Sequence, residues 1–214
     1  MMSWRRVTRF LLALALCVAN VQQVASQTSD SEMLGRALDY FQGEKYHEAL
    51  LIFHKLDQTY HLNPRFRAYM GLCYYYEWDY EHASKCFDEL ILQLDVFAPH
   101  ERSVYYYSDA ESHFNLHEYG KSIPLYEQML LVCYDNEKPD AFYRLGLCYM
   151  FAKDWYNARD YFTSSLSYYR RYRNSTDEQA RIAQIDNMIR GCDEQLKDSA
   201  STIVQKNDTT ALTK

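Results

Sequence analysis

Residues 71–87 read GLCYYYEWDYEHASKCF, and residues 146–162 read GLCYMFAKDWYNARDYF. The string Gly-Leu-Cys-Tyr opens both segments, and an aromatic residue, an alanine and a phenylalanine follow at the same offsets. The repeated cysteine raises two hypotheses: a chemical site, such as a disulfide, metal ligand or nucleophile, or a structural repeat. Self-similarity at a fixed period is the signature of repeat architectures, so the rest of the chain distinguishes the two.

The pattern aromatic-x-x-small-x-x-x-aromatic occurs four times in the chain. Its first aromatic residues are Tyr46, Tyr80, Tyr119 and Trp155, at spacings of 34, 39 and 36 residues. A small residue lies nine positions before each of them: Ala37, Gly71, Ala110 and Gly146. Six positions before each lie Tyr40, Tyr74, His113 and Tyr149. Small residues let two helices approach closely and aromatic rings fill the space beside them, which favours a repeat of paired helices.

The period and the pattern resemble the tetratricopeptide repeat, a helix–turn–helix unit of about 34 residues. The resemblance covers about residues 30–172 and implies an all-α fold, a right-handed α-solenoid of about four helix pairs. Only 6 glycines and 4 prolines occur in 214 residues, which agrees with helices. One pair cannot bury its apolar face alone, so stacked neighbours form the core. The units are predicted at about 30–63, 64–98, 103–136 and 139–172.

The C-terminal part departs from the repeat. Ser175 and Thr176 are good helix caps, and Ile182, Ile185 and Ile189 can lie on one helical face. Residues 175–198 are therefore predicted to form a capping helix that closes the array. Residues 199–214 are polar without periodicity, which predicts a disordered tail.

The N-terminus has the pattern of a signal peptide. Arg5, Arg6 and Arg9 precede an apolar run from Phe10 to Val18, and a small-residue cleavage site ends near Ser26. Residues 1–26 are thus predicted to be removed, leaving a periplasmic or secreted protein. The run is too short to be a stable membrane span, which needs about 20 apolar residues. Lipoprotein anchoring at Cys17 is disfavoured because Leu16 stands where a small residue is expected.

Charge argues against several partner classes. Without residues 1–26, the chain has 20 Lys and Arg against 29 Asp and Glu, a net charge of −9. Nucleic-acid binding draws most of its affinity from a basic patch, so no nucleic-acid partner is expected. Docking on anionic lipid is disfavoured for the same reason.

Cysteine usage does not indicate a disulfide framework. The predicted mature chain has five cysteines: Cys73, Cys86, Cys133, Cys148 and Cys192. An odd and low number is atypical of disulfide-stabilised domains, although one bridge such as Cys73–Cys86 stays open. Cys73 and Cys148 occupy equivalent positions of the second and fourth units. They are interpreted as small buried thiols, because free cysteine behaves as a small hydrophobe.

The resemblance implies a protein-interaction module whose first helices line a concave groove. The family's groove positions fall here on Leu38, Phe41, Leu72, Tyr75, Tyr76, Tyr107, Phe114, Tyr143, Leu147, Met150 and Phe151. Glu111 also matches one of them. The lining lacks the Lys and Asn residues with which some family members clamp acidic tails. An apolar or Pro-rich segment, or an amphipathic helix, is the favoured partner.

The predicted function is an exported, non-catalytic adaptor or scaffold in envelope or secretion assembly. The alternative is a structural subunit that self-assembles. His113 and His117 lie four residues apart, as in a helical metal pair, but no HExxH motif accompanies them. The sequence has no phosphate-binding loop or nucleophile elbow either, so no enzyme activity, metal or cofactor is predicted.

Overall fold

A computed structural model describes residues 29–173 and 175–211, with only the backbone for residues 200 and 202–211. These residues form two compact units that divide between Glu77 and Trp78. The predicted signal peptide, including Cys17, lies outside the described residues. Each unit is described by itself.

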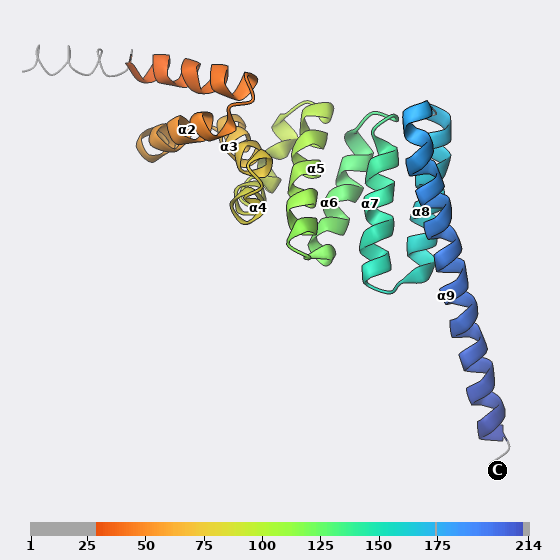
Figure 1. The fold of residues 1–214 in the computed structure, drawn as a ribbon. Helices are drawn as coiled ribbons and strands as arrows, with labels where there is room; N and C mark the ends of the chain where they lie inside the picture. The colour runs from red at the N-terminus through yellow and green to blue at the C-terminus, as the bar shows by residue number, and fades with distance from the viewer. Residues whose placement is uncertain (1–28, 174, 212–214) are drawn as a thin grey trace, which may run out of the picture. The chain divides into compact units, whose positions relative to one another are not determined.

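The described part of the N-terminal unit, from residue 29 on, contains three helices: the first over residues 29–42, then α2 (Tyr46–Tyr60) and α3 (Pro64–Tyr76) (Figure 1). Helix α3 begins where Asn63 accepts hydrogen bonds from the backbone N–H groups of Arg65 and Phe66. Pro64 follows at a position where its missing N–H is not needed. The core of the unit consists of Ala37, Ala49, Phe53, Met70 and Cys73. Ala37 and Phe53, the small residue and the last aromatic residue of the first predicted repeat, thus lie in one core.

The C-terminal unit begins with α4 (Tyr80–Asp88), the 3₁₀ helix η1 (Ile91–Val96) and α5 (Pro99–Asn115). It continues with α6 (Tyr119–Val132), α7 (Lys138–Phe151) and α8 (Trp155–Tyr172). A 3₁₀ turn η2 (Thr176–Glu178) leads to α9 (Gln179–Ala211). Helices α5 to α9 lie side by side in chain order (Figure 1). The predicted all-α fold of consecutive helix pairs is therefore confirmed.

The turns inside the pairs share one backbone conformation. A residue with positive φ stands two positions before each first aromatic: Glu44, Trp78, His117 and Lys153. In the last turn, the N–H groups of Lys153 and Asp154 donate to the carbonyls of Met150 and Tyr149. Asp154 then caps α8 by accepting from the N–H of Asn157. These hydrogen bonds give partners to carbonyl groups at the end of one helix. They also position the aromatic residue at the start of the next helix.

The long spacing of 39 residues between the second and third patterns has a structural cause. Helix α4 has only 9 residues, and the 6 residues of η1 follow it. Leu90, Leu94 and Phe97 of this segment are buried. The extra residues thus add apolar surface to the core of the C-terminal unit.

Helix α9 is longer than the sequence predicts. Its Ile182, Ile185 and Cys192 join the core cluster of α7 and α8, as expected of a capping helix. It then continues to Ala211 and so includes residues 199–211, for which the sequence predicts a disordered tail. No proline interrupts the segment, and the hydroxyls of Ser199 and Ser201 donate to carbonyls one turn earlier. Residues 212–214 lie outside the described residues. None of the helices in the described ranges is both long and apolar enough to cross a bilayer.

The predicted burial of Cys73 and Cys148 is confirmed, since both side chains are fully buried. Cys73 carries a free thiol, so the Cys73–Cys86 bridge that the sequence left open is not formed in the described structure.

The two buried thiols should resist modification. Burial, with Glu77 near one thiol and Glu111 near the other, raises the pKa of Cys73 and Cys148 to about 12. The thiolate is the reactive form, so both should be alkylated at least roughly tenfold more slowly than the half-buried Cys133. Pulsed iodoacetamide labelling with peptide mass spectrometry measures this, and labelling in urea should equalise the three. Rapid native labelling of either buried thiol would contradict the structure.

Candidate functional site

Three aromatic rings interlock at one edge of the N-terminal unit. Phe41 lies at the end of the first helix, Tyr46 begins α2, and Tyr76 ends α3. The rings of Tyr46 and Tyr76 stack with centroids 4.4 Å apart and planes at 16°. Phe41 meets Tyr46 edge-on at 5.9 Å. We call this set the N-terminal ring trio.

The C-terminal unit contains the same arrangement two helix pairs further along the chain. Phe114 lies near the end of α5, Tyr119 begins α6, and Phe151 ends α7. Tyr119 and Phe151 stack at 4.8 Å and 18°, and Phe114 meets Tyr119 edge-on at 5.4 Å. We call this set the C-terminal ring trio. Equivalent repeat positions thus produce equivalent ring contacts in both units.

The last ring of each trio is only half covered. Tyr76 is 45% exposed and Phe151 is 49% exposed, although each stacks on a neighbouring ring. Large aromatic side chains held rigidly at a surface are typical anchors of protein interfaces, because they offer much contact area with little entropy to lose. The trios are therefore the candidate functional surface.

The eleven predicted groove residues do not share one environment. Leu38, Phe41, Leu72, Tyr75 and Tyr76 fall in the N-terminal unit, and the other six fall in the C-terminal unit. Phe41 and Tyr76 belong to one trio, and Phe114 and Phe151 to the other. Tyr75 and Tyr107 are half-buried, while Leu38 and Met150 pack partly against the cores of their units. The remaining three, Leu72, Tyr143 and Leu147, are buried.

Helix α9 accounts for the burial of Tyr143 and Leu147. Both residues share a core cluster with Ile182 and Ile185 of this helix. The Arg181 guanidinium of α9 also lies over the Tyr143 ring, 4.6 Å from its centroid. The capping helix thus covers this part of the fourth unit's predicted lining, which leaves Phe151 as its most accessible ring.

A buried ion pair lies beneath the C-terminal ring trio. The Glu111 carboxylate, on a side chain only 4% exposed, accepts from Nε and Nη2 of Arg144, each at 2.6 Å. The Tyr126 hydroxyl donates to Oε1 of the same carboxylate at 2.6 Å. Arg144 also lies 4.8 Å from the centroid of the Phe114 ring. Burial opposes the charge of Arg144, but the Glu111 carboxylate beside it keeps the pKa of the guanidinium above its usual value. Glu111 is therefore occupied inside the protein and not available to a partner.

The two histidines that the sequence places one turn apart do not form a pair. His113 is buried, whereas His117 is exposed in the α5–α6 turn, where its Nδ1 lies 2.9 Å from the Tyr119 hydroxyl. Helix α5 ends at Asn115, so the helical spacing that would join the two imidazoles is lost.

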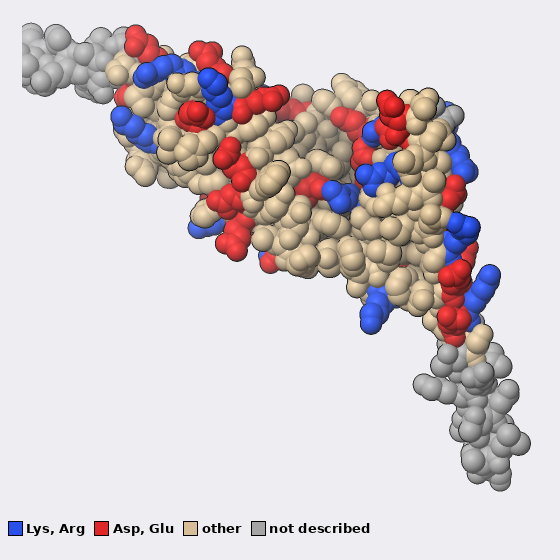
Figure 2. Space-filling view, in the orientation of Figure 1, with Lys and Arg blue, Asp and Glu red and all other residues tan. Residues whose placement is uncertain are grey.

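Charge is distributed unevenly over the C-terminal unit. In Figure 2, uncharged residues cover most of the visible surface over α5 to α8, whereas lysines, arginines and acidic residues alternate along α9. The largely uncharged face favours apolar contacts over ionic ones.

Sequence reasoning missed Tyr46 and Tyr119 as surface residues because the repeat pattern assigns them to packing. It missed Arg144 because no groove position of the family falls on it. The four first aromatics were visible in the sequence, but which face of each ring stays open depends on contacts between helices.

Comparison with solved structures supports the fold. The chain is similar to the segment of MamA from residue 41 to its end from Desulfovibrio magneticus RS-1, with 15% identity and a TM-score of 0.54. That similarity covers 79% of this chain and 96% of the other. MamA AMB-1 gives 10% identity and a TM-score of 0.57, covering 78% and 92%. A crystal structure of MamA protein gives 13% and 0.55, covering 80% and 94%. At such identities the likeness shows the fold alone.

Comparisons based on sequence add nothing to this. No protein-family model matches the chain, and no curated protein matches it. The tetratricopeptide-type fold that the repeat predicted is confirmed, and the function has to be inferred from the molecule's own surfaces.

Proposed function

We propose that this chain is a non-catalytic interaction scaffold that holds partner segments against its ring trios, one trio in each unit. The observation that carries the proposal is the repeated half-exposed ring at the end of α3 and of α7. Each of these rings, Tyr76 and Phe151, stacks on a neighbouring ring and is still about half exposed. A ring fixed in this way can accept a second flat or apolar group without losing conformational freedom.

The chemistry of the trios favours an apolar or Pro-rich segment. Proline rings and aliphatic side chains pack well on exposed aromatic faces, as in other modules that bind extended peptides. The Tyr46 and Tyr119 hydroxyls can add hydrogen bonds to a peptide backbone. An acidic tail would find little positive charge here, because Arg144 is already bound to Glu111.

Export is part of the proposal and rests on the sequence. Three arginines followed by an apolar run and a small-residue site support a cleaved signal peptide. Mass spectrometry of the protein recovered from its native source should find a mature chain that begins near Gln27. Recovery of a chain that retains residues 1–26 would contradict this part of the proposal.

The binding surface can be tested by site-specific crosslinking. A photo-crosslinking phenylalanine analogue in place of Phe151 should capture a defined partner from native extract, identified by mass spectrometry. The same analogue in place of Tyr156 is the matched control, because Tyr156 is 58% exposed but is the second residue of the next helix, α8, and belongs to neither trio. The proposal expects partner capture at position 151 and not at position 156.

Affinity for the captured partner gives the quantitative test. The double variant Tyr76→Ala/Phe151→Ala should bind at least about tenfold more weakly than the wild type, as expected for interface anchors, whereas Tyr156→Ala should bind normally. Equal binding by the folded double variant would refute the role of the trios. Light scattering tests self-assembly: if position 151 captures only another copy of this chain and the chain forms oligomers, the partner is the chain itself.

A further inference from the structure

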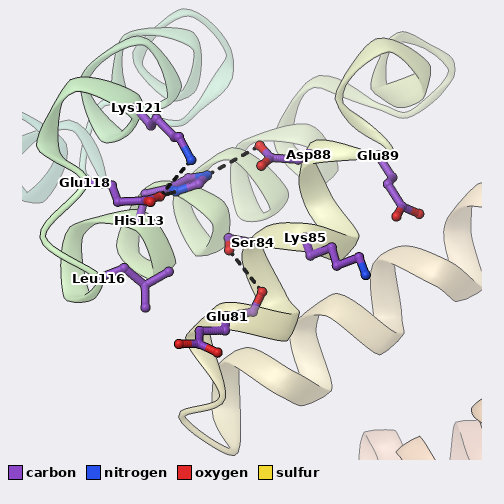
Figure 3. Close-up of a pocket in the computed structure, with 9 residues that line it drawn as sticks. All are labelled: Glu81, Ser84, Lys85, Asp88, Glu89, His113, Leu116, Glu118 and Lys121. Carbon is purple, nitrogen blue, oxygen red and sulfur yellow. Dashed lines mark hydrogen bonds and ion pairs between the residues drawn. The ribbon is translucent and has the colours of Figure 1, made fainter.

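Two acidic residues and one histidine converge between α4 and α5. Asp109 and His113 lie one turn apart on α5, and Asp88 is the last residue of α4. One potential ligand atom from each lies within 4.8 Å of the other two. In Figure 3, Asp88 and Glu118 approach the His113 ring from opposite sides.

Asp109 is the anomalous member of this cluster. Its side chain is 1% exposed, and neither carboxylate oxygen has a hydrogen-bond partner in the described structure. Its Oδ1 lies 3.5 Å from Nε2 of His113, which is within ion-pair range but makes no hydrogen bond. Burial, reinforced by the charge of Asp88, raises the pKa of Asp109 to about 8. A carboxylate so placed is costly unless something compensates for it.

The imidazole is held with one nitrogen directed at the two aspartates. Nδ1 of His113 lies 2.6 Å from Oε2 of Glu118, so the Nδ1–H donates to this carboxylate. Glu118 is itself held by Nζ of Lys121 at 2.9 Å. The other nitrogen, Nε2, then faces Oδ1 of Asp88 at 3.4 Å and Oδ1 of Asp109 at 3.5 Å. In the neutral imidazole this places a lone pair against two carboxylate oxygens.

The spacing of these atoms fits a metal ion better than a proton. Both distances exceed the 2.7–3.2 Å of good N–H···O hydrogen bonds. Ligands of a tetrahedral zinc ion, with bonds of about 2.0–2.1 Å, are separated by about 3.3 Å. We propose that Asp88, Asp109 and His113 bind a divalent transition-metal ion, with Zn²⁺ the best fit. Glu118 would orient His113, as carboxylates commonly do for metal-bound histidines.

The surroundings provide charge and access. The cluster opens to a pocket of about 440 Å³, lined in part by Glu81, Lys85 and Glu89. Together with Asp88, Asp109 and Glu118 this gives five carboxylates against two lysines, Lys85 and Lys121. A net negative pocket concentrates cations, and Asp88 at its exposed edge offers an entry point.

The cluster exists because the third unit departs from the repeat at two positions. His113 stands where the other units have Tyr40, Tyr74 and Tyr149. Asp109 stands where they have Arg36, Met70 and Leu145. Both departures lie on the same face of α5 and meet at one point. An aromatic position, and a position that is apolar in the second and fourth units, are thus both occupied here by metal-ligand types.

The ligand set narrows the choice of metal. One imidazole nitrogen and two carboxylate oxygens suit Zn²⁺ and its first-row neighbours, whereas Mg²⁺ and Ca²⁺ prefer oxygen ligands alone. Three protein ligands leave a fourth position open to water or a partner's side chain.

Zinc titration of the tag-free full chain after chelator treatment tests the site. Calorimetry near neutral pH should show saturable binding of one Zn²⁺ per chain that excess Mg²⁺ does not displace. Asp109→Asn and His113→Gln should each weaken binding at least about tenfold, and Glu118→Gln should weaken it by a similar factor. His117→Gln is the matched control, four residues from His113 and exposed, and should bind as the wild type does.

Nitrogen NMR of the wild-type histidines provides a readout that needs no variant. Added Zn²⁺ should shift Nε2 of a single imidazole among seven while its Nδ1 stays protonated. The proposal is overturned if the wild type shows no saturable Zn²⁺ binding, or if folded Asp109→Asn binds as well as the wild type. Should the variants fail to fold, a zinc-induced shift spread over several histidines would equally overturn it.

Discussion

Replacing Gly146 with alanine should destabilise the protein by roughly 2 kcal/mol, because the site has no room for one methyl group. A Cβ at this position would lie 2.5, 2.6 and 2.9 Å from three carbons of the Phe162 ring. Real Cβ contacts are longer than this, so either the ring or helix α7 must move. Phe162 is fully buried and packs against Tyr143 at 5.9 Å, so the ring has little freedom to give way.

Two opposing effects decide the size of the loss. Alanine favours a helix interior over glycine by about 1 kcal/mol. Forcing extra atoms into a close-packed core costs about 1–3 kcal/mol, and we expect the upper end here because Phe162 is fully buried. The packing cost exceeds the helical gain, so the net effect is destabilising.

Urea denaturation of the wild type and of four variants (Gly146→Ala, Gly191→Ala, Phe162→Leu and Gly146→Ala/Phe162→Leu) measures this balance. Gly191→Ala is the matched control, since no atom lies within 4 Å of a Cβ built there and the residue is inside α9. That variant should gain stability by up to about 1 kcal/mol. Combining Gly146→Ala with Phe162→Leu should cost less than the sum of the two single changes, because the smaller side chain makes room. If Gly146→Ala instead stabilised the protein, helices α7 and α8 would not be in close contact at this position.

The repeated Gly-Leu-Cys-Tyr string shows what the sequence could predict. Gly146 is the close-approach residue that the repeat implied, and Cys148 is fully buried. Periodicity identifies such positions because each repeat contains the same local contacts. Periodicity also predicts the helix pairs and the turns between them. In the last turn, Lys153 has a positive φ and Asp154 caps α8.

The candidate sites depended on contacts that periodicity does not encode. Tyr143 matches a groove position, but α9 covers it, and a pattern within one unit says nothing of what packs over it. Asp109 and His113 are an i, i+4 pair in the sequence, but so are His113 and His117, and His117 lies beyond the end of the helix. The third ligand, the carboxylate of Asp88, comes from another helix pair. Long-range contacts of this kind require the folded structure.

Removing Arg144 should cost more stability than removing the charge of Glu111, although the two side chains form one ion pair. Arg144→Met leaves a carboxylate that is 4% exposed, with the Tyr126 hydroxyl as its remaining donor among the side-chain contacts described here. Breaking a buried pair in this way costs about 3–5 kcal/mol, and we expect about 3 because Arg144 is itself 29% exposed. Glu111→Gln should cost about 1–2 kcal/mol, since the amide oxygen still accepts from Tyr126 and the guanidinium can reach water.

If only the number of lost hydrogen bonds mattered, Arg144→Met and Glu111→Gln would cost the same. A larger cost for Arg144→Met would show that the burial of the unpaired carboxylate matters. The double variant Glu111→Leu/Arg144→Met should cost less than Arg144→Met alone, because no buried charge is left unpaired, although the buried Tyr126 hydroxyl loses its acceptor. Arg159→Met is the control for loss of a surface arginine: its partners Asp160 and Asp193 are exposed, so little or no change is expected. The midpoints of urea denaturation of the four variants, each compared with the wild type, measure these differences in stability. If Glu111→Gln proved as costly as Arg144→Met, the burial of the carboxylate would not be what makes this pair important, and the C-terminal ring trio would owe its rigidity to ring packing alone.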